Sequence, residues 1–292
     1  MTGKDYFYNG MSCYKNNENN YMGRNFMSDE IKYETPSDHV RLITMNRPET
    51  LNSLTPDGNA AMMDYVRQFR DDDDAWVLVV TGAGERSFST GLDLRAQSQR
   101  DSSDVEPPPP PQVPDEGLHA YPSIEVFKPV IAAINGYAFG GGSEMALWAD
   151  IRIMSENAEM GLLEPKRGLL SISGTTRMSR AIPIGLAMEL IITGRRYKAA
   201  DCYRMGLVSQ VVPQEELMNT AIGMADEIVA ECSPIATRVA KEHIYRTLHL
   251  STREALQIQS LNSNRLRQLS PHDTQEGPKA FVEKRKPQFE AR

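Results

Sequence analysis

The chain has little cysteine, and its cysteines are poorly spaced for cross-linking or metal binding. Its 292 residues include only three, which lie far apart in the sequence: Cys13, Cys202 and Cys232. An odd, widely spaced set does not form a disulfide framework or a structural zinc site, and it is typical of a reducing compartment. We therefore expect a cytoplasmic protein that holds no metal.

The chain also lacks long apolar runs and an excess of positive charge. None of its apolar segments approaches the ~20 residues that a membrane-crossing helix needs, so no membrane is expected as a partner. The 32 lysines and arginines are outnumbered by 39 aspartates and glutamates, which gives a net charge of −7. Such a chain is not expected to bind nucleic acid over a general surface. None of the five histidines neighbours a serine or cysteine in a way that indicates a catalytic triad.

What the chain does have is a glycine-rich turn between a strand and a helix. Val130–Ile134 is β-branched and apolar enough to form a buried strand, and Ser143–Ala149 reads as the first turns of a helix. Three successive glycines, Gly140–Gly142, let the backbone turn tightly and leave peptide N–H groups uncovered. Because the positive end of the helix dipole points back into this turn, the turn suits an anion that develops during a reaction.

A second apolar strand followed by a glycine turn lies earlier in the chain. Trp76–Thr81 is a continuous apolar strand, ended by the glycines of Gly82–Gly84 and followed by the segment SFSTGLDL at residues 87–94. Together with KPVIAAINGYAFGGGSE at residues 128–144, this pattern resembles the enoyl-CoA hydratase/isomerase (crotonase) family. The similarity continues in family order to residue 292 through these segments: Ala149–Ile153, Met160–Glu164, Arg177–Arg180, Leu190–Gly194, Met205–Val208 and Phe281–Arg285.

The resemblance implies an α/β fold, a crotonase-like spiral of ββα repeats with a C-terminal helical trimerisation layer that makes homotrimers or homohexamers. The local pattern agrees with this alternation. Val40–Met45 reads as a strand, and Thr55 with Pro56 reads as the capped start of a helix. The predicted apolar face of that helix holds three side chains: Met62, Val66 and Phe69.

The rest of the chain is divided by composition. We expect a disordered N-terminal tail (residues 1–29), in which Met27 is a candidate start of the folded protein, a spiral core (30–225) and a C-terminal helical region (226–292). The proline run at residues 107–111 reads as a surface loop, and in crotonase relatives this stretch borders the acyl pocket. Later helices are predicted over Leu186–Thr193, Ala199–Met205, Gln214–Ala230 and Pro234–Leu248, with Gly194 and Gly206 ending the first two.

The resemblance also implies that main-chain amides and two carboxylates have different roles in the reaction. The N–H groups of Thr90 and Gly141 would hold the carbonyl oxygen of a coenzyme A thioester as it becomes negative, each worth roughly 3 kcal/mol. Hydration of an enoyl thioester needs water deprotonated at the β carbon and a proton delivered to the α carbon. We expect Glu144 to hold and activate the water and Glu164 to transfer the proton at the α carbon. Partial burial would raise carboxyl pKa values toward the working range.

Coenzyme A is expected as part of the substrate, and the predicted reaction uses no cofactor. The resemblance implies that the adenine and pantetheine lie along a short segment after the second strand: Ser89, Leu92, Asp93 and Leu94. Three cations near the C-terminus are candidates for the phosphates, from a neighbouring subunit, or are plain surface charges: Lys279, Lys284 and Arg285.

Other readings stay open at this point. A family member could act as a double-bond isomerase with Glu164 alone, or it could be a silent scaffold that binds acyl-CoA or a partner. Gly82–Gly84 resembles a dinucleotide-binding turn, but it lacks the third glycine and a helix directly behind it. Asp71–Asp74 reads as a solvated acidic turn rather than a metal site.

The loop after Glu164 departs from the family pattern. Relatives commonly have G-x-x-P-x-x-G-G here, whereas this chain has GLLSISGTT at residues 168–176, without the proline and with fewer glycines. We expect the loop to begin a helix and its apolar side chains to narrow or reshape the acyl pocket.

Overall fold

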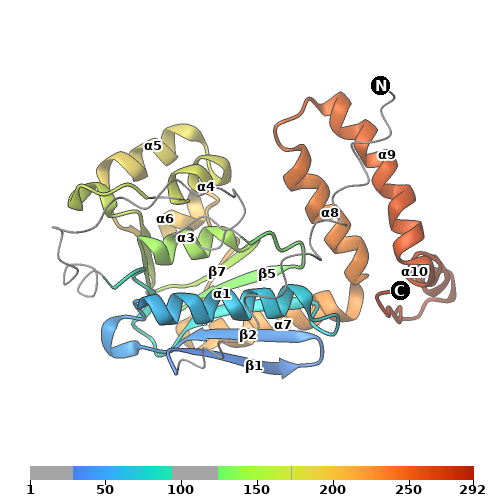
Figure 1. Ribbon diagram of the computed structural model, residues 1–292, viewed down its shortest axis with the longest axis horizontal. Helices are drawn as coiled ribbons and strands as arrows, with labels where there is room; N and C mark the ends of the chain where they lie inside the picture. Colours follow the sequence, from blue (N-terminus) through green and yellow to red (C-terminus); the bar gives the residue numbers. More distant parts are fainter. Residues whose placement is uncertain (1–28, 94–123, 172) are drawn as a thin grey trace, which may run out of the picture.

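The computed structural model describes residues 29–93, 124–171 and 173–292 (Figure 1). Most of the predicted tail, with Cys13 and Met27, lies outside these ranges, as do Leu94 and the proline run at residues 107–111. The described residues form two β-sheets with helices packed around them.

The larger sheet has six strands in the order β1-β2-β3-β5-β7-β10. These are β1 Ile31–Ser37, β2 Val40–Met45, β3 Val77–Gly82, β5 Val130–Ile134, β7 Ile151–Ser155 and β10 Gln210–Val212. β1 pairs antiparallel with β2, and the other neighbours pair parallel. β3 and β5 are buried along their whole length, which explains why both read as continuous apolar runs rather than alternating ones.

The smaller sheet has the order β4-β6-β8-β9. Its strands are β4 Ser87–Ser89, β6 Tyr137–Phe139, β8 Glu159–Gly161 and β9 Tyr197–Lys198. The first three follow directly on β3, β5 and β7, so the chain passes from the larger sheet to the smaller one three times. Helix α1 (Pro56–Asp71) precedes the first of these passages, and α3 (Gly141–Trp148) lies between the second and the third. This repeat of two strands and a helix is the α/β spiral that the resemblance implied.

Both faces of β3 are covered by helices. Alternate residues of β3 pack with α1 on one face and with α7 (Leu217–Glu231) on the other. The prediction for α1 is confirmed, because its three named apolar side chains are buried and Thr55 accepts a hydrogen bond from the Gly58 N–H. The strand sequence therefore fills two apolar clusters at once, one on each side of the sheet.

The later helices that were predicted match the structure closely, apart from one interruption, and the structure adds α9 and α10, which were not predicted. They are α4 Gly174–Ala181, α5 Ile184–Thr193, α6 Ala199–Arg204, α8 Pro234–Thr247, α9 Thr252–Leu269 and α10 Pro271–Glu283. Gly194 and Gly206 adopt left-handed φ angles of 54° and 75°, as expected for glycines that end helices. The predicted helix at 214–230 is divided into a 3-10 turn, Gln214–Glu216, and α7, so the boundary drawn at residue 225 falls inside α7. Beyond α7, α8 and α9 stand to one side of the sheets (Figure 1).

The two weaker signals in the sequence have structural explanations. Gly82–Gly84 leads into β4 and not into a helix, so it lacks the helix N-terminus that binds phosphate in dinucleotide folds. In the acidic turn after α1, Asp72 and Asp74 lie 2.9 and 3.2 Å from the Arg41 guanidinium. Within the described ranges no group of three or more His, Cys, Asp or Glu side chains could hold a metal ion. No helix in those ranges is long and apolar enough to cross a bilayer.

Helix α8 is fastened to the sheet by a lysine. Lys241 Nζ donates to Asp150 Oδ2 at 2.6 Å and to the Lys128 carbonyl oxygen at 2.9 Å. Asp150 Oδ2 also accepts the Val130 N–H at 2.8 Å, so one carboxylate joins α8 to the start of β5. The two charged side chains are only 13% and 22% exposed, which makes this pair sensitive to the loss of either partner.

We expect Lys241→Met to lower the free energy of unfolding by about 3 kcal/mol, because it leaves the half-buried Asp150 carboxylate without its cation. Lys286→Met is the matched control, since Lys286 is 80% exposed and lies 3.6 Å from Glu231. Its loss should stay below about 1 kcal/mol. Chemical denaturation measures both variants, and equal losses would show that the Lys241 pair does not fasten α8.

Candidate active site

The end of β4 and the start of α3 are in direct backbone contact. A Cβ atom added to Gly142 would lie 2.0 Å from the Ser89 carbonyl oxygen, so only a glycine allows this approach. Gly91 has a φ of +83°, and a Cβ there would lie 2.6 Å from the Gly141 nitrogen. The turn at Thr90–Gly91 therefore lies against the first residue of α3. Because Gly141 begins the helix, its N–H has no acceptor within the helix.

Two buried serines hold this turn in place. Ser89 Oγ donates to the Asn52 carbonyl oxygen at 2.8 Å and accepts the Gly91 N–H at 3.1 Å. Ser143 Oγ donates to the Ala138 carbonyl oxygen at 2.6 Å and accepts the Gly161 N–H at 3.1 Å. The Ser89 side chain is fully enclosed, so the predicted contact of coenzyme A with this segment would be to its backbone.

Glu144 reaches the start of α4 and is held there by three donors. Its Oε1 accepts hydrogen bonds from Ser171 Oγ at 2.6 Å, the Ser173 N–H at 2.9 Å and the Gly174 N–H at 3.0 Å. The side chain is 4% exposed and belongs to the first turn of α3. A carboxylate that binds the free N–H groups of a second helix is stabilised by that helix's dipole as well as by the bonds themselves. Glu144 therefore joins α3 to α4.

Glu164 lies half-buried beside the same turn. It opens a 3-10 turn, Glu164–Arg167, directly after β8. Its Oε2 is buried and has no hydrogen-bond partner among the described residues. Burial raises the pKa of Glu164, and the nearby charge of Glu144 raises it further, against the lowering effects of its own backbone N–H and of the Ser171 hydroxyl. A Cβ on Gly140 would lie 3.6 Å from Glu164 Oε1 and 3.7 Å from the Thr90 carbonyl oxygen.

The structure thus gathers four of the predicted residues around one turn and leaves others elsewhere. Thr90, Gly141, Glu144 and Glu164 lie at the junction of β4, α3 and β8. Leu92, which follows Thr90 and Gly91, forms a β-bridge with Leu54, which lies just before α1.

Asp93 and the three C-terminal cations have neighbours outside this junction. Asp93 lies 3.4 Å from Arg47. Arg285 binds Glu276 through both terminal nitrogens, at 2.5 and 2.8 Å. Lys284 ends α10 in a left-handed conformation, and Lys279 is exposed on the same helix. Helix α10 lies at the far side of the chain from α3 (Figure 1), so a single chain does not bring these cations to the glutamates.

Sequence reasoning missed Ser171, Ser173 and Gly174 as partners of Glu144. They lie 27 to 30 residues beyond it in the chain, so no local spacing connects them. One signal was available, because a serine-rich loop that ends in glycine before a polar, periodic segment is typical of a helix start.

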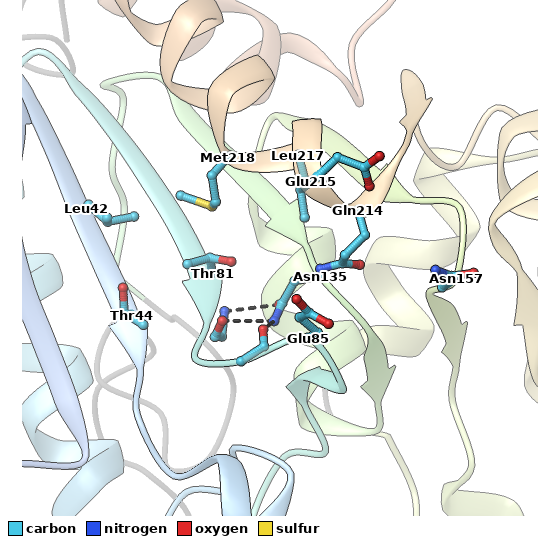
Figure 2. Close-up of a pocket in the computed structure, with 12 residues that line it drawn as sticks. Leu42, Thr44, Thr81, Glu85, Asn135, Asn157, Gln214, Glu215, Leu217 and Met218 are labelled. Carbon is cyan, nitrogen blue, oxygen red and sulfur yellow. Dashed lines mark hydrogen bonds between the residues drawn. The ribbon is translucent and has the colours of Figure 1, made fainter.

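A cavity elsewhere on the chain does not contain this chemistry. It measures about 580 Å³ and lies between the ends of β2 and β3 and the start of α7, where Leu42, Thr81 and Met218 line it (Figure 2). Asn135 projects toward it, but its amide donates to the carbonyl oxygens of neighbouring turn residues (Figure 2). The residues that line the cavity include neither Glu144 nor Glu164.

Comparisons with known proteins agree with the geometry. A family model described as enoyl-CoA hydratase/isomerase matches residues 35–292. The chain is 38% identical over 259 residues to an (E)-benzylidenesuccinyl-CoA hydratase from Thauera aromatica, with 87% of this chain and 96% of that protein covered. It is 36% identical over 273 residues to a carnitinyl-CoA dehydratase from Proteus mirabilis, with 91% and 100% covered.

Solved structures show the same fold. An enoyl-CoA hydratase from Bacillus anthracis superposes with a TM-score of 0.80 at 33% identity, over 90% of this chain and 100% of its own. An enoyl-CoA hydratase from Mycobacterium tuberculosis also gives 0.80, at 29% identity, over 91% and 100%.

The contact between β4 and α3 predicts the effect of a single methyl group. Gly142→Ala should lower the free energy of unfolding by about 3 kcal/mol, since its Cβ meets a backbone oxygen that cannot move alone. Gly185→Ala, in α5, is the matched control, because nothing lies within 4 Å of its added Cβ. Replacing a helical glycine there should stabilise the protein by up to about 1 kcal/mol. Thermal unfolding tests both, and a harmless Gly142→Ala would contradict the close approach.

The raised pKa of Glu164 predicts a pH-dependent stability difference. Since the folded state holds this proton more tightly than the unfolded state, wild-type stability falls as pH rises from the ordinary pKa of 4.5 through the raised value. The Glu164→Gln side chain does not titrate. The stability of this variant relative to the wild type should therefore rise over that pH window and stay raised at higher pH.

Glu254→Gln is the control for that experiment and should behave oppositely. The hydrogen bonds with Ser251 lower the pKa of Glu254, so the stability that the Glu254 carboxylate contributes is lost as pH falls. Glu254→Gln should therefore be less stable than the wild type near neutral pH. Denaturation from pH 4 to pH 8 measures both, and a Glu164→Gln curve parallel to the wild type would show that Glu164 is not held in its acid form.

Proposed function

The chain belongs to the enoyl-CoA hydratase/isomerase family, and from that premise we propose that it adds water reversibly across the 2,3 double bond of an enoyl thioester of coenzyme A. The product is the 3-hydroxyacyl thioester. The observation that carries the proposal is a pair of carboxylates with unlike surroundings beside the turn of β4 and α3. Glu144 is buried and has three donors, whereas Glu164 is half-buried and has one enclosed oxygen without a partner among the described residues.

The main-chain amides of that turn would stabilise the enolate. Attack of water at the β carbon moves negative charge onto the thioester oxygen, and the N–H groups of Thr90 and Gly141 are proposed to bind it. Their close approach is supported by the contact of Gly91 with Gly141. Fixed donors of this kind need no reorganisation during the reaction, so each can contribute roughly 3 kcal/mol.

Glu144 is proposed to orient the attacking water and accept its proton. All three of the hydrogen bonds described above go to Oε1, which fixes the plane of the carboxylate. Oε2 is then the oxygen that would take up the proton as the C–O bond forms. A base that is held rigidly keeps the water near the β carbon, which is the positional part of its contribution.

Glu164 is proposed to deliver the proton to the α carbon. Its raised pKa keeps a share of the side chain protonated nearer to neutral pH, as an acid catalyst requires. The buried Oε2, which has no partner among the described residues, is a suitable position for that proton.

A second candidate, double-bond isomerisation, draws support from the same carboxylate. Glu164 alone could remove a proton from one carbon of the acyl chain and return it to another, while the enolate is held by the amides. We favour the hydratase because, in an isomerase that uses Glu164 alone, the fixed and buried Glu144 would have no chemical task. The same pair argues against a silent acyl-CoA-binding scaffold, since burying one carboxylate and partly burying a second beside it destabilises a fold that makes no use of them.

The acyl group is proposed to be more elaborate than a plain short chain. The two relatives described above are named for benzylidenesuccinyl-CoA and carnitinyl-CoA, which are not simple fatty acyl thioesters. The loop after Glu164 presents Leu169 and Leu170, which are 49% and 77% exposed. Such side chains would favour an acyl group with its own apolar surface.

We also propose that the protein forms a homotrimer or homohexamer, which is the assembly that the family resemblance implied. Several helices present large apolar side chains to solvent in the single chain, and covering them would be favourable. These side chains are between 59% and 85% exposed: Ile192 on α5, Ile244 on α8, Leu256 on α9 and Phe281 on α10. In such an assembly Lys279 and Lys284 could approach the phosphates of coenzyme A in a neighbouring subunit.

Paired substitutions test the proposed roles. Against crotonyl-CoA, an aromatic enoyl-CoA and crotonobetainyl-CoA, the wild type should consume at least one, measured as loss of the conjugated thioester absorbance. Glu144→Gln and Glu164→Gln should each lower kcat by roughly 10²- to 10⁴-fold, because each removes one proton-transfer group.

Isomerisation of a 3-enoyl-CoA separates the two candidate reactions. An isomerase would keep its activity in Glu144→Gln and lose it in Glu164→Gln. Full hydratase activity in Glu144→Gln would contradict the roles assigned here, and binding of acyl-CoA without any turnover would favour the scaffold.

A further inference from the structure

The hydroxyl of Ser171 stands between the two glutamates. It is 3% exposed and donates to Glu144 Oε1 at 2.6 Å. It also lies close enough to Glu164 to lower the pKa of that carboxyl, against the larger effect of burial. One hydroxyl proton therefore faces two carboxylates, and a hydroxyl can donate to only one acceptor at a time.

The loop around Ser171 is built so that this hydroxyl has little room to move. A Cβ on Gly174 would lie 2.2 Å from Ser171 Oγ, so only a glycine at that position leaves space for the hydroxyl. The Ser171 carbonyl oxygen accepts a bond from Thr175 Oγ1 at 3.2 Å, which ties the residue to the first turn of α4.

The three donors to Glu144 are not equivalent. The N–H groups of Ser173 and Gly174 come with the helix start and would remain with any side chain at those positions. The bond from Ser171 depends on the side chain alone. In the sequence pattern described above this position carries a proline, which has no hydroxyl to donate.

We propose, on the basis of the function inferred above, that Ser171 is a positioning residue that gives the two glutamates different tasks. Its proton is committed to Glu144, which stays fixed as the hydrogen-bond acceptor that orients water. Glu164 is affected by the same hydroxyl only through a lowering of its pKa that burial outweighs, and it is left as the carrier of the transferable proton. Ser171 itself does not contact the reacting atoms in this assignment.

Among the described residues, the charged groups beside the pair come from α3, α4 and the 3-10 turn that holds Glu164. From α3, Glu164 faces Glu144, and from α4, Arg177 interacts with Glu144. Lys166 follows Glu164 in the same 3-10 turn but is directed against Gly194. A substitution that alters only Ser171 leaves all of these groups in place.

The test is the titration of Glu164 in the intact protein, followed by NMR of ¹³C-labelled glutamate carboxyls and assigned with Glu164→Gln. Ser171→Ala removes a hydroxyl that lowers the pKa of Glu164, so the titration should move to higher pH. In turnover, the limb of the pH profile on which the acid form is lost should move in the same direction. The kcat should fall about tenfold, with KM changed less than about twofold, because a lost orienting bond affects the reaction more than binding.

Ser173→Ala is the matched control. It also removes a hydroxyl from this loop, but that hydroxyl has no hydrogen-bond partner among the described residues, and the variant keeps its N–H for Glu144. Its Glu164 titration should coincide with that of the wild type. The thiol of Ser171→Cys is a weak donor of similar size, so the Glu164 titration of this variant should fall between those of the wild type and Ser171→Ala. Ser171→Cys replaces Ser171→Ala in the test if the alanine variant does not fold.

The outcomes separate this inference from the proposed function. An unshifted Glu164 titration in both Ser171 variants would overturn the positioning role, even in an active hydratase. A shifted titration in a protein that hydrates no enoyl thioester would keep the coupling between Ser171 and the glutamates and contradict the function assigned to them.

Discussion

The site depends on one backbone contact, the approach of the Ser89 carbonyl oxygen to the Cα of Gly142. It brings the end of a strand in the smaller sheet against the first turn of α3, where the proposed pair of peptide N–H groups would act together. Any side chain at position 142 would separate them. The positive φ of Gly91 and the buried hydroxyl of Ser89 serve the same contact, because they direct the strand end into the turn. An anion at this place would be held by fixed dipoles, as the proposed function requires.

Two carboxylates of the same chemical type acquire different properties from their surroundings. Glu144 accepts hydrogen bonds from donors at the start of α4, whereas Glu164 is half-buried and keeps a buried oxygen without a partner among the described residues. Burial and the neighbouring charge raise the pKa of Glu164. A pair of acids that differ in this way can work as base and acid at one pH, which one shared environment would not allow. The Ser171 hydroxyl is the group through which the two environments are kept apart.

The sequence predicted those parts of the fold that depend on short stretches of chain. The strand at Val130–Ile134 and the capped start of α1 at Thr55 depend on neighbours within a few residues, so their patterns are visible in the sequence. The second sheet was not recognised strand by strand, because β4 and β6 are three residues long and are defined by pairing with each other. Helix α9 was also missed, although Ser251 and Glu254 form a capping box at its start. The partners of Glu144 could not be found, since the tertiary fold alone brings Ser171 to it.

Thr90 and Gly141 are central because every proposed step leaves its charge on the oxygen that they would hold. The most direct measurement is a crystal structure of the protein with an unreactive thioester of coenzyme A. The account predicts that the thioester oxygen lies within about 3.2 Å of both the Thr90 and the Gly141 nitrogen atoms, with Glu164 facing the α carbon. A thioester bound elsewhere, or an oxygen out of reach of either amide, would contradict it.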